Sequence, residues 1–160
     1  MTILATERLT LSPPTLDDAA FVLELLNDPG WLRNIGDRGV RTVAEARAYI
    51  RERFGKGAWF VVRDQAGERL GTCGLIDREG LMHWDIGYAF LQRHAGQGYA
   101  TEAARAVLRH GRETLGLGTI SAITDLENLA SRRVLEKIGL RYVDDRQVPG
   151  VEGMSAYFET

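Results

Sequence analysis

The sequence predicts an α+β fold, a single domain over residues 1–160 in which a mixed, mostly antiparallel central sheet is flanked by helices. The length of 160 residues is close to the roughly 150 expected of one domain. In the front half, strand-like runs follow one another through short glycine-containing connections, which is typical of antiparallel hairpins. Further on, a strand, a long helix and another strand indicate one β-α-β crossover.

The first third of the chain contains a strand and two helices. Alternating apolar residues predict a strand over 9–11, which ends at a pair of prolines. A helix follows, capped by Thr15 and Asp18 and ended by Pro29 and Gly30. A second amphipathic helix spans 42–54, and its start at Thr42 has the spacing of a capping box.

A glycine-rich segment, residues 30–39, joins these two helices and carries an aromatic ring and two arginines. Such a segment is either a plain surface connection or a loop that lines a substrate site. On the second interpretation, Trp31 and Arg33 are the candidate substrate-contacting residues.

The middle and the end of the chain supply the remaining elements. An apolar stripe predicts one long buried helix over 99–115. The other predicted elements are strands over 59–63, 70–76, 82–91 and 119–124, a helix over 130–138, and closing strands over 140–144 and 156–158.

Composition narrows the class of protein. Hydrophobic residues make up 44% and charged residues 26% of the chain, as in folded globular proteins. The formal net charge of -2 gives no global positive field, so neither nucleic acid nor a membrane is an expected partner. The chain shows no signal-peptide pattern, and no apolar run approaches the roughly 20 residues of a membrane span. Cys73 is the only cysteine, so we expect a cytoplasmic protein without disulfides.

The most informative segment is the turn that precedes the long helix. It places Gly96 and Gly98 before a helix whose first turn contains Ala100 and Thr101. Small residues there expose consecutive backbone N–H groups, which can cradle a pyrophosphate, and the Thr101 hydroxyl can add a donor. Two alternating glycines alone also fit a plain tight turn. A dinucleotide-binding fold would use the same glycines with Asp125, but the chain has too few crossovers for a doubly wound sheet.

Three segments together carry a resemblance to a known family. They are the strand from Asp85 to Tyr88, the run from Gly96 to Ala103 and the run from Glu127 to Leu140. The chain resembles the GNAT superfamily of acyl-CoA-dependent N-acetyltransferases, and within it the RimJ/RimL-like branch that contains the ribosomal-protein N-terminal acetyltransferases. The similarity extends over essentially the whole chain and implies a GNAT-type domain with the crossover at the cofactor site.

The resemblance implies acetyl-CoA as the cosubstrate. Its phosphates would bind backbone amides of the glycine turn, although Ala95 stands where the family commonly has a polar side chain. The pantetheine arm would pair with the strand ending near Phe90, which is expected to splay from its neighbour at a bulge. One amide there would bond the thioester carbonyl. The implied cofactor-binding residues are Tyr88, Ala89, Phe90, Gly96, Gln97, Gly98, Tyr99, Ala100, Thr101, Asn128 and Ser131.

Two residues near the start of the helix over 130–138 have two interpretations each. Asn128 matches the family residue whose side chain bonds the cofactor arm, and asparagine is also a favoured helix N-cap. The frequent general acid of the family, a tyrosine, would fall at Leu135. Ser131, one turn earlier on the same face, is the substitute candidate, with a packing or capping hydroxyl as the alternative.

The acceptor amine must lose a proton during the reaction. Asp85 is the candidate base, because it lies on the strand that leads to the splay, and His83 lies on the same strand face. For both residues a solvated side chain is the alternative. Asp85 is also expected, with Trp31 and Arg33, to contact the substrate. No cluster of His, Cys or carboxylate residues has metal-ligand spacing.

The resemblance therefore implies an N-acetyltransferase that binds acetyl-CoA and an amine together, with direct attack by the amine. The acceptor is a protein N-terminus or a small-molecule amine, and the chain is expected to act as a monomer or homodimer. Two alternatives stay open: a non-catalytic acyl-CoA-binding sensor, favoured by the absence of a tyrosine at Leu135, and a nucleotide-binding module.

Overall fold

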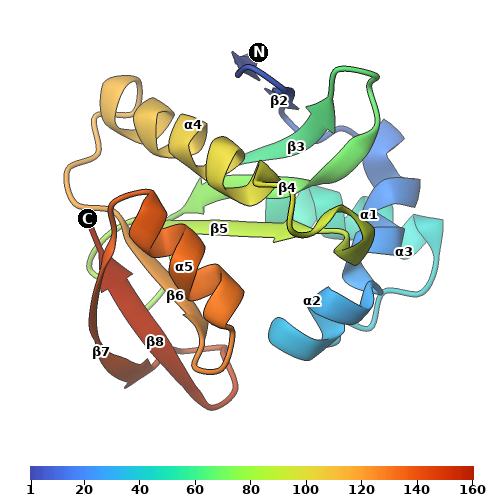
Figure 1. The fold of residues 1–160 in the computed structure, drawn as a ribbon. Coiled ribbons are helices and arrows are strands. Elements are labelled where there is room, and N and C mark those ends of the chain that lie inside the picture. The colour runs from blue at the N-terminus through green and yellow to red at the C-terminus, as the bar shows by residue number, and fades with distance from the viewer.

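The computed structural model describes residues 1–160, whose strands form one mixed sheet (Figure 1). The sheet has eight strands in the order β1-β2-β3-β4-β5-β6-β8-β7. All neighbouring strands are antiparallel except β5 and β6, which are parallel. The strands are β1 (Leu4–Ala5), β2 (Leu9–Ser12), β3 (Ala58–Asp64), β4 (Arg69–Ile76), β5 (Asp85–Phe90), β6 (Ser121–Asp125), β7 (Arg141–Gln147) and β8 (Met154–Glu159).

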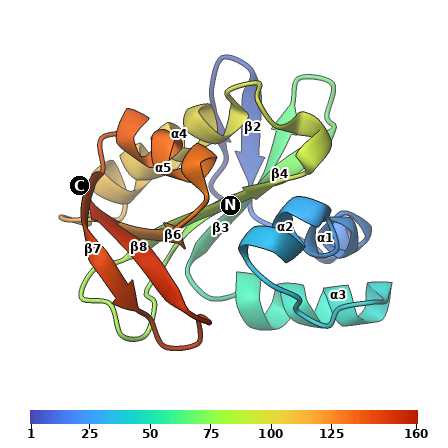
Figure 2. The same ribbon diagram turned by 60° about the horizontal axis from the view of Figure 1, so that its bottom comes forward.

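Helices cover both faces of this sheet (Figure 2). Helices α4 and α5 pack on one face over a core that includes Leu75, Val107 and Leu135. Helices α1, α2 and α3 pack on the other face over a second core, which includes Leu25 and Val61. The helices are α1 (Ala19–Leu26), α2 (Pro29–Asn34), α3 (Val43–Tyr49), α4 (Tyr99–Glu113) and α5 (Leu129–Lys137), with short helical turns η1 (Leu16–Asp18), η2 (Ile50–Phe54) and η3 (Gln92–His94). None of them combines the length and apolarity needed to cross a bilayer.

The α+β prediction is confirmed. Strands β3, β4 and β5 form two consecutive antiparallel hairpins, and the crossover through α4 joins the parallel pair β5 and β6. The strand expected over 82–91 is shorter than predicted, because β5 begins only at Asp85 and Met82 is 89% exposed. Strand β8 lies between β6 and β7, so β7 forms the sheet edge.

One predicted boundary is wrong, and it affects a candidate site residue. Pro29 does not end a helix and open a loop; it is the first residue of α2. Proline fits this position because its missing N–H would have no partner in the first helical turn. Asp28 caps the helix by accepting from Gly30 N–H. Trp31 is therefore a buried helix residue, 8% exposed, in the core shared with α1.

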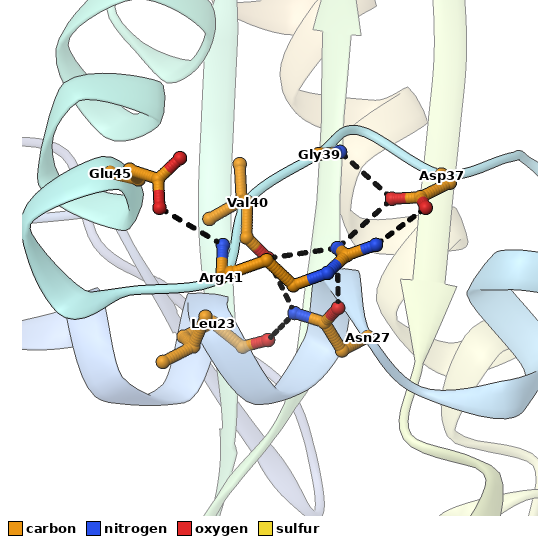
Figure 3. A network of polar contacts seen from close by, with 7 residues as sticks. All are labelled: Leu23, Asn27, Asp37, Gly39, Val40, Arg41 and Glu45. Carbon is orange, nitrogen blue, oxygen red and sulfur yellow. Dashed lines mark hydrogen bonds and ion pairs between the residues drawn. The ribbon is translucent and has the colours of Figure 1, made fainter.

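The segment between α2 and α3 is held to α1 by a polar network (Figure 3). The Arg41 guanidinium donates to the Asp37 carboxylate at 2.6 Å and to the Asn27 side-chain oxygen at 2.9 Å. The Asn27 amide donates to the carbonyl oxygens of Leu23 and Val40, both at 2.8 Å. The second half of the predicted glycine-rich loop therefore has a defined path beside α1.

Candidate active site

Strands β5 and β6 diverge directly after they meet. Their register consists of one pair, Asp85 with Ser121, and Ser121 N–H donates to Trp84 O at 2.8 Å. Trp84 O therefore faces β6. Because backbone groups alternate between the two edges of a strand, those of Tyr88 and Phe90 face the same way, into the splay. These groups are free to pair with a ligand.

Two expectations about β5 need correction. The backbone groups of Ala89 do not face the splay, because Ala89 lies opposite Thr72 of β4 and the next bond on that edge runs from Leu91 N–H to Leu70 O at 3.0 Å. Consecutive residues of a strand cannot all present their backbone to one edge. The expected bulge is also absent, since the pairing of β4 with β5 shows no register shift. The splay arises from divergence of the parallel pair.

The end of β5 leads through η3 into an exposed glycine turn and helix α4. Gly96 and Gly98 adopt left-handed backbone conformations, with φ of 78° and 81°. A Cβ at Gly96 would meet no atom within 4 Å, so the turn is open. No side chain caps α4, and its first internal bond runs from Glu102 N–H to Gly98 O at 3.1 Å. The N–H groups of residues 99–101 therefore lack helical partners and can bind an anion.

An arginine from the start of the chain supports this turn, and sequence reasoning missed it. Arg8 Nη1 donates to Gln97 O at 2.9 Å, and Arg8 Nε donates to Glu102 Oε1 at 2.7 Å. Its guanidinium also lies 4.6 Å from the Tyr99 ring centroid. Because the C=O and N–H of a peptide unit point in opposite directions, the bond to Gln97 O turns the Gly98 N–H away from Arg8. The pairing also offsets the charge of Glu102, which would oppose an anion here.

Helix α5 begins beside β5. Asn128 Oδ1 accepts from Ser131 N–H at 3.1 Å, so the helix-cap interpretation of Asn128 is confirmed. Tyr88 Oη lies 2.9 Å from Ser131 Oγ and also donates to Ser131 O at 3.1 Å. Leu135 is 1% exposed and belongs to the core, so its position contributes no group to a ligand site.

Asp85 lies at the closed end of the splay. It is 1% exposed, its Oδ2 accepts from Arg78 Nε at 3.0 Å, and its Oδ1 has no hydrogen-bond partner. Burial raises the pKa of this carboxyl to about 6, against the opposing effect of Arg78. The solvated interpretation of Asp85 is therefore wrong, and a carboxyl with this pKa is a base at neutral pH. His83 lies before β5, with its Nε2 at 3.9 Å from Glu159 Oε2.

The structure brings together part of the predicted site. The glycine turn continues from β5, and Ser131 contacts Tyr88 of that strand. Asp85 lies about 10 Å along the strand from Tyr88, at ~3.3 Å per residue. Trp31 and Arg33 lie on α2 across the sheet, Trp31 buried and Arg33 exposed. No group of three or more His, Cys, Asp or Glu side chains is arranged to hold a metal ion.

The splayed strand and the uncapped helix start define a protein that can hold an elongated ligand with an anionic end. Comparison with known proteins specifies the family. Residues 8–141 match the family model described as an acetyltransferase (GNAT) domain. The chain belongs to the GNAT acetyltransferase family and is an acetyltransferase.

Similar proteins cover nearly the whole chain. YkkB of Bacillus subtilis, an uncharacterized protein, is 35% identical over 150 residues, which are 88% of this chain and 86% of YkkB. A GNAT-family acetyltransferase from Bacillus anthracis has a TM-score of 0.83 at 25% identity, with coverage of 99% and 98%. RimL, described as a ribosomal L7/L12 alpha-N-protein acetyltransferase in complex with coenzyme A, shares the fold, with a TM-score of 0.83 at 16% identity and coverage of 99% and 97%.

Proposed function

We propose that this protein transfers an acetyl group from acetyl-CoA to a primary amine, with both substrates bound and the amine attacking directly. One observation carries the proposal: the free backbone groups of Tyr88 and Phe90 lead along β5 into the uncapped N–H groups of residues 99–101. An acyl-CoA has the matching shape, because its peptide-like pantetheine arm ends in a pyrophosphate. The fold shared with coenzyme A-bound RimL supports this match.

Acetyl-CoA supplies a thioester, and residues of the chain hold it in place. Tyr88 and Phe90 pair with the pantetheine arm, and the Asn128 amide and Ser131 hydroxyl line the side of α5. Backbone N–H groups bind the pyrophosphate, and the Thr101 hydroxyl adds a donor. The residues that form this pyrophosphate cradle are Gly96, Gln97, Gly98, Tyr99, Ala100 and Thr101.

A backbone N–H of β5 that faces the splay, that of Tyr88 or Phe90, polarises the thioester carbonyl. It is fixed by the strand before the substrate arrives, so it needs no reorganisation when negative charge develops on the carbonyl oxygen. A preorganised donor of this kind lowers the barrier by about 3 kcal/mol.

The acceptor amine enters from the face of the sheet that α1, α2 and α3 cover. Side chains alternate along β5, and Ala89 packs against the core on this face, so Asp85 points the same way. We assign Asp85 as the base, acting through ordered water because the carboxyl is 1% exposed. Arg33, exposed on α2, is assigned to contact the acceptor, and buried Trp31 supports that helix.

The acceptor is a protein N-terminus or a small-molecule amine. Ser131 at the start of α5 supports placing the chain in the branch that contains the ribosomal-protein N-terminal acetyltransferases, and the fold shared with RimL is consistent with it. The protein is proposed to work in the cytoplasm as a monomer or homodimer, without nucleic acid or membrane. A second candidate function, a non-catalytic acyl-CoA sensor, is favoured by the burial of Leu135 in the core.

Turnover separates the two candidates. The purified protein and acetyl-CoA are offered peptides with free alanine or serine N-termini, and small amines such as spermidine, while release of free thiol is followed. Acceptor-dependent thiol release supports the transferase. Binding of acetyl-CoA in calorimetry, with no release of free thiol for any amine, favours the sensor. Stabilisation in thermal melting by NAD or ATP, and not by acetyl-CoA, would instead indicate the nucleotide-binding module.

Arg8→Met is expected to weaken acetyl-CoA binding about tenfold, the value of one lost charge-assisted hydrogen bond. The substitution keeps an unbranched side chain, removes the donor to the Gln97 carbonyl and leaves Glu102 without a cation beside the cradle. Calorimetry measures the dissociation constant. Arg146→Met is the matched control, since Arg146 pairs with Asp144 at 2.8 Å on distant β7. Equal affinities for the two variants would contradict a role for Arg8 in the cradle.

Ser131→Ala is expected to lower kcat by no more than about 100-fold, the lower end of general acid-base effects. A thiol of pKa about 8.5 leaves as thiolate without full proton transfer. The helix cap survives, because Asn128 accepts from the backbone N–H of Ser131 and not from its hydroxyl. Steady-state kinetics give kcat and the KM for acetyl-CoA. A loss of many thousandfold with unchanged cofactor affinity would show that Ser131 does more than assist the leaving thiolate.

A further inference from the structure

The hydroxyls of Tyr88 and Ser131 meet at the splay. Tyr88 Oη lies 2.9 Å from Ser131 Oγ and 3.1 Å from Ser131 O, although the two residues come from β5 and from the first turn of α5. Side chains alternate along β5, and Tyr88, like Ile86, packs on the face covered by α4 and α5. The phenol thus reaches Ser131, the residue that the family resemblance makes the candidate proton donor.

The single proton of the Tyr88 hydroxyl decides what Ser131 can offer. When Tyr88 donates to the Ser131 carbonyl, its oxygen can accept the Ser131 hydroxyl proton. When Tyr88 donates to Ser131 Oγ instead, the Ser131 proton is free for a third group. Burial raises the pKa of Tyr88 above its usual value, although the hydrogen bond to Ser131 lowers it. The phenol therefore remains a donor at working pH.

We propose that Tyr88 is a positioning residue for acetyl transfer: it donates to Ser131 Oγ, so that the Ser131 hydroxyl donates to the departing sulfur. The inference rests on the proposed function, because an acyl-CoA is the ligand that brings a sulfur to Ser131. The family resemblance places a tyrosine on the helix at position 135, where this chain has Leu135, buried in the core. In this chain strand β5 supplies a phenol to the site instead.

The step balances without a co-reactant. The carbon–sulfur bond breaks and its electron pair stays on sulfur, where the Ser131 O–H stabilises it by a hydrogen bond. Ser131 Oγ gains the Tyr88 hydrogen bond in exchange, and Tyr88 keeps its proton. The proton that finally forms the free thiol is the one the acceptor amine loses, carried by the base and water.

Coenzyme A itself tests this contact without any acceptor. Its thiolate absorbs ultraviolet light more strongly than its thiol, so the pKa of the bound thiol can be titrated. We expect a value below the about 8.5 of a free thiol in the parent protein. Tyr88→Phe is expected to raise it by about one unit, and Ser131→Ala by at least as much. The double variant should match Ser131→Ala alone, because both residues act through one hydroxyl.

Two controls isolate the hydroxyl from the fold. Tyr142→Phe removes a phenol that donates to Asp145 on β7 at 2.8 Å, and should leave the titration at the parental value. Desulfo-coenzyme A, which lacks the sulfur, should bind the parent and Tyr88→Phe equally. In turnover, Tyr88→Phe should lower kcat about tenfold and leave the KM for acetyl-CoA within about twofold.

The outcomes separate this inference from the proposed function. A parent protein that does not bind coenzyme A would overturn both. Two results would overturn the inference alone, in a parent protein that binds coenzyme A and turns over acetyl-CoA. In the first, Tyr88→Phe leaves the pKa of the bound thiol at the parental value. In the second, the effects of the two substitutions add up in the double variant. If Tyr88→Phe does not fold, a ring-fluorinated tyrosine at this position provides the second variant. As a stronger donor of the same shape it should lower the thiol pKa further, and an unchanged value overturns the inference.

Discussion

Gly98→Glu is expected to abolish acetyl-CoA binding, with a loss of affinity of about 100-fold or more, while the fold persists. The new carboxylate would stand at the centre of the cradle and repel the pyrophosphate. A Cβ at this position would lie 3.3 Å from Arg8 Nη2, so the glutamate would also compete with Glu102 and Gln97 for that guanidinium. Calorimetry with acetyl-CoA measures the loss, and circular dichroism checks the fold.

The control for this variant must carry the same charge and the same backbone strain. Gly98 has a φ of 81°, so any side chain there costs about 1–2 kcal/mol apart from its effect on binding. Gly116 has a φ of 68° with no atom within 4 Å of a built Cβ, and it follows the C-terminal end of α4, at the opposite end of that helix from the cradle. Gly116→Glu should lose similar stability and keep the parental affinity. A folded Gly98→Glu protein with that same affinity would overturn the cofactor assignment.

The cradle could be predicted from the sequence because its signal is local. Gly96 and Gly98 mark left-handed positions, and small residues after them mark an open helix start. Arg8 could not be predicted in this way, since it reaches Gln97 from 89 positions away and no local pattern connects them. The one available hint was Glu102, because a carboxylate beside an expected phosphate site needs a nearby cation to offset its charge.

Errors on the other side of the sheet have physical causes as well. Proline both stops helices and starts them, so Pro29 was ambiguous without knowledge that Asp28 caps the next turn. The burial of Asp85 likewise depends on contacts from β4, β6 and Arg78 that no local pattern contains.

Burial of Asp85 also affects stability. An acid whose pKa in the folded protein is raised, here from 3.8 to about 6, binds its proton more tightly when folded than when unfolded. The contribution of Asp85 to folding stability is therefore most favourable at pH values below the pKa of the carboxyl in the unfolded protein. It is lost as the pH rises through the pKa of the carboxyl in the folded protein. The asparagine of Asp85→Asn resembles the protonated acid. The free energy of unfolding of this variant should exceed that of the parent by about 1–3 kcal/mol at pH 7.5, and the difference should be smaller at pH 4.5. Chemical denaturation at both pH values measures this difference.

The same substitution is expected to lower kcat/KM at pH 7 by about 100-fold or more, the range of a lost general base. Acceptor amines have pKa values of about 8 to 10, so at neutral pH few molecules are unprotonated, and a protein without a base depends on that fraction. Part of the loss should return as pH rises, which a pH–rate profile of both proteins measures. An Asp85 without a role as base predicts instead a pH–rate profile of the variant that runs parallel to that of the parent. That result, at equal acetyl-CoA affinity, would remove Asp85 from the mechanism and leave His83 or water as the base.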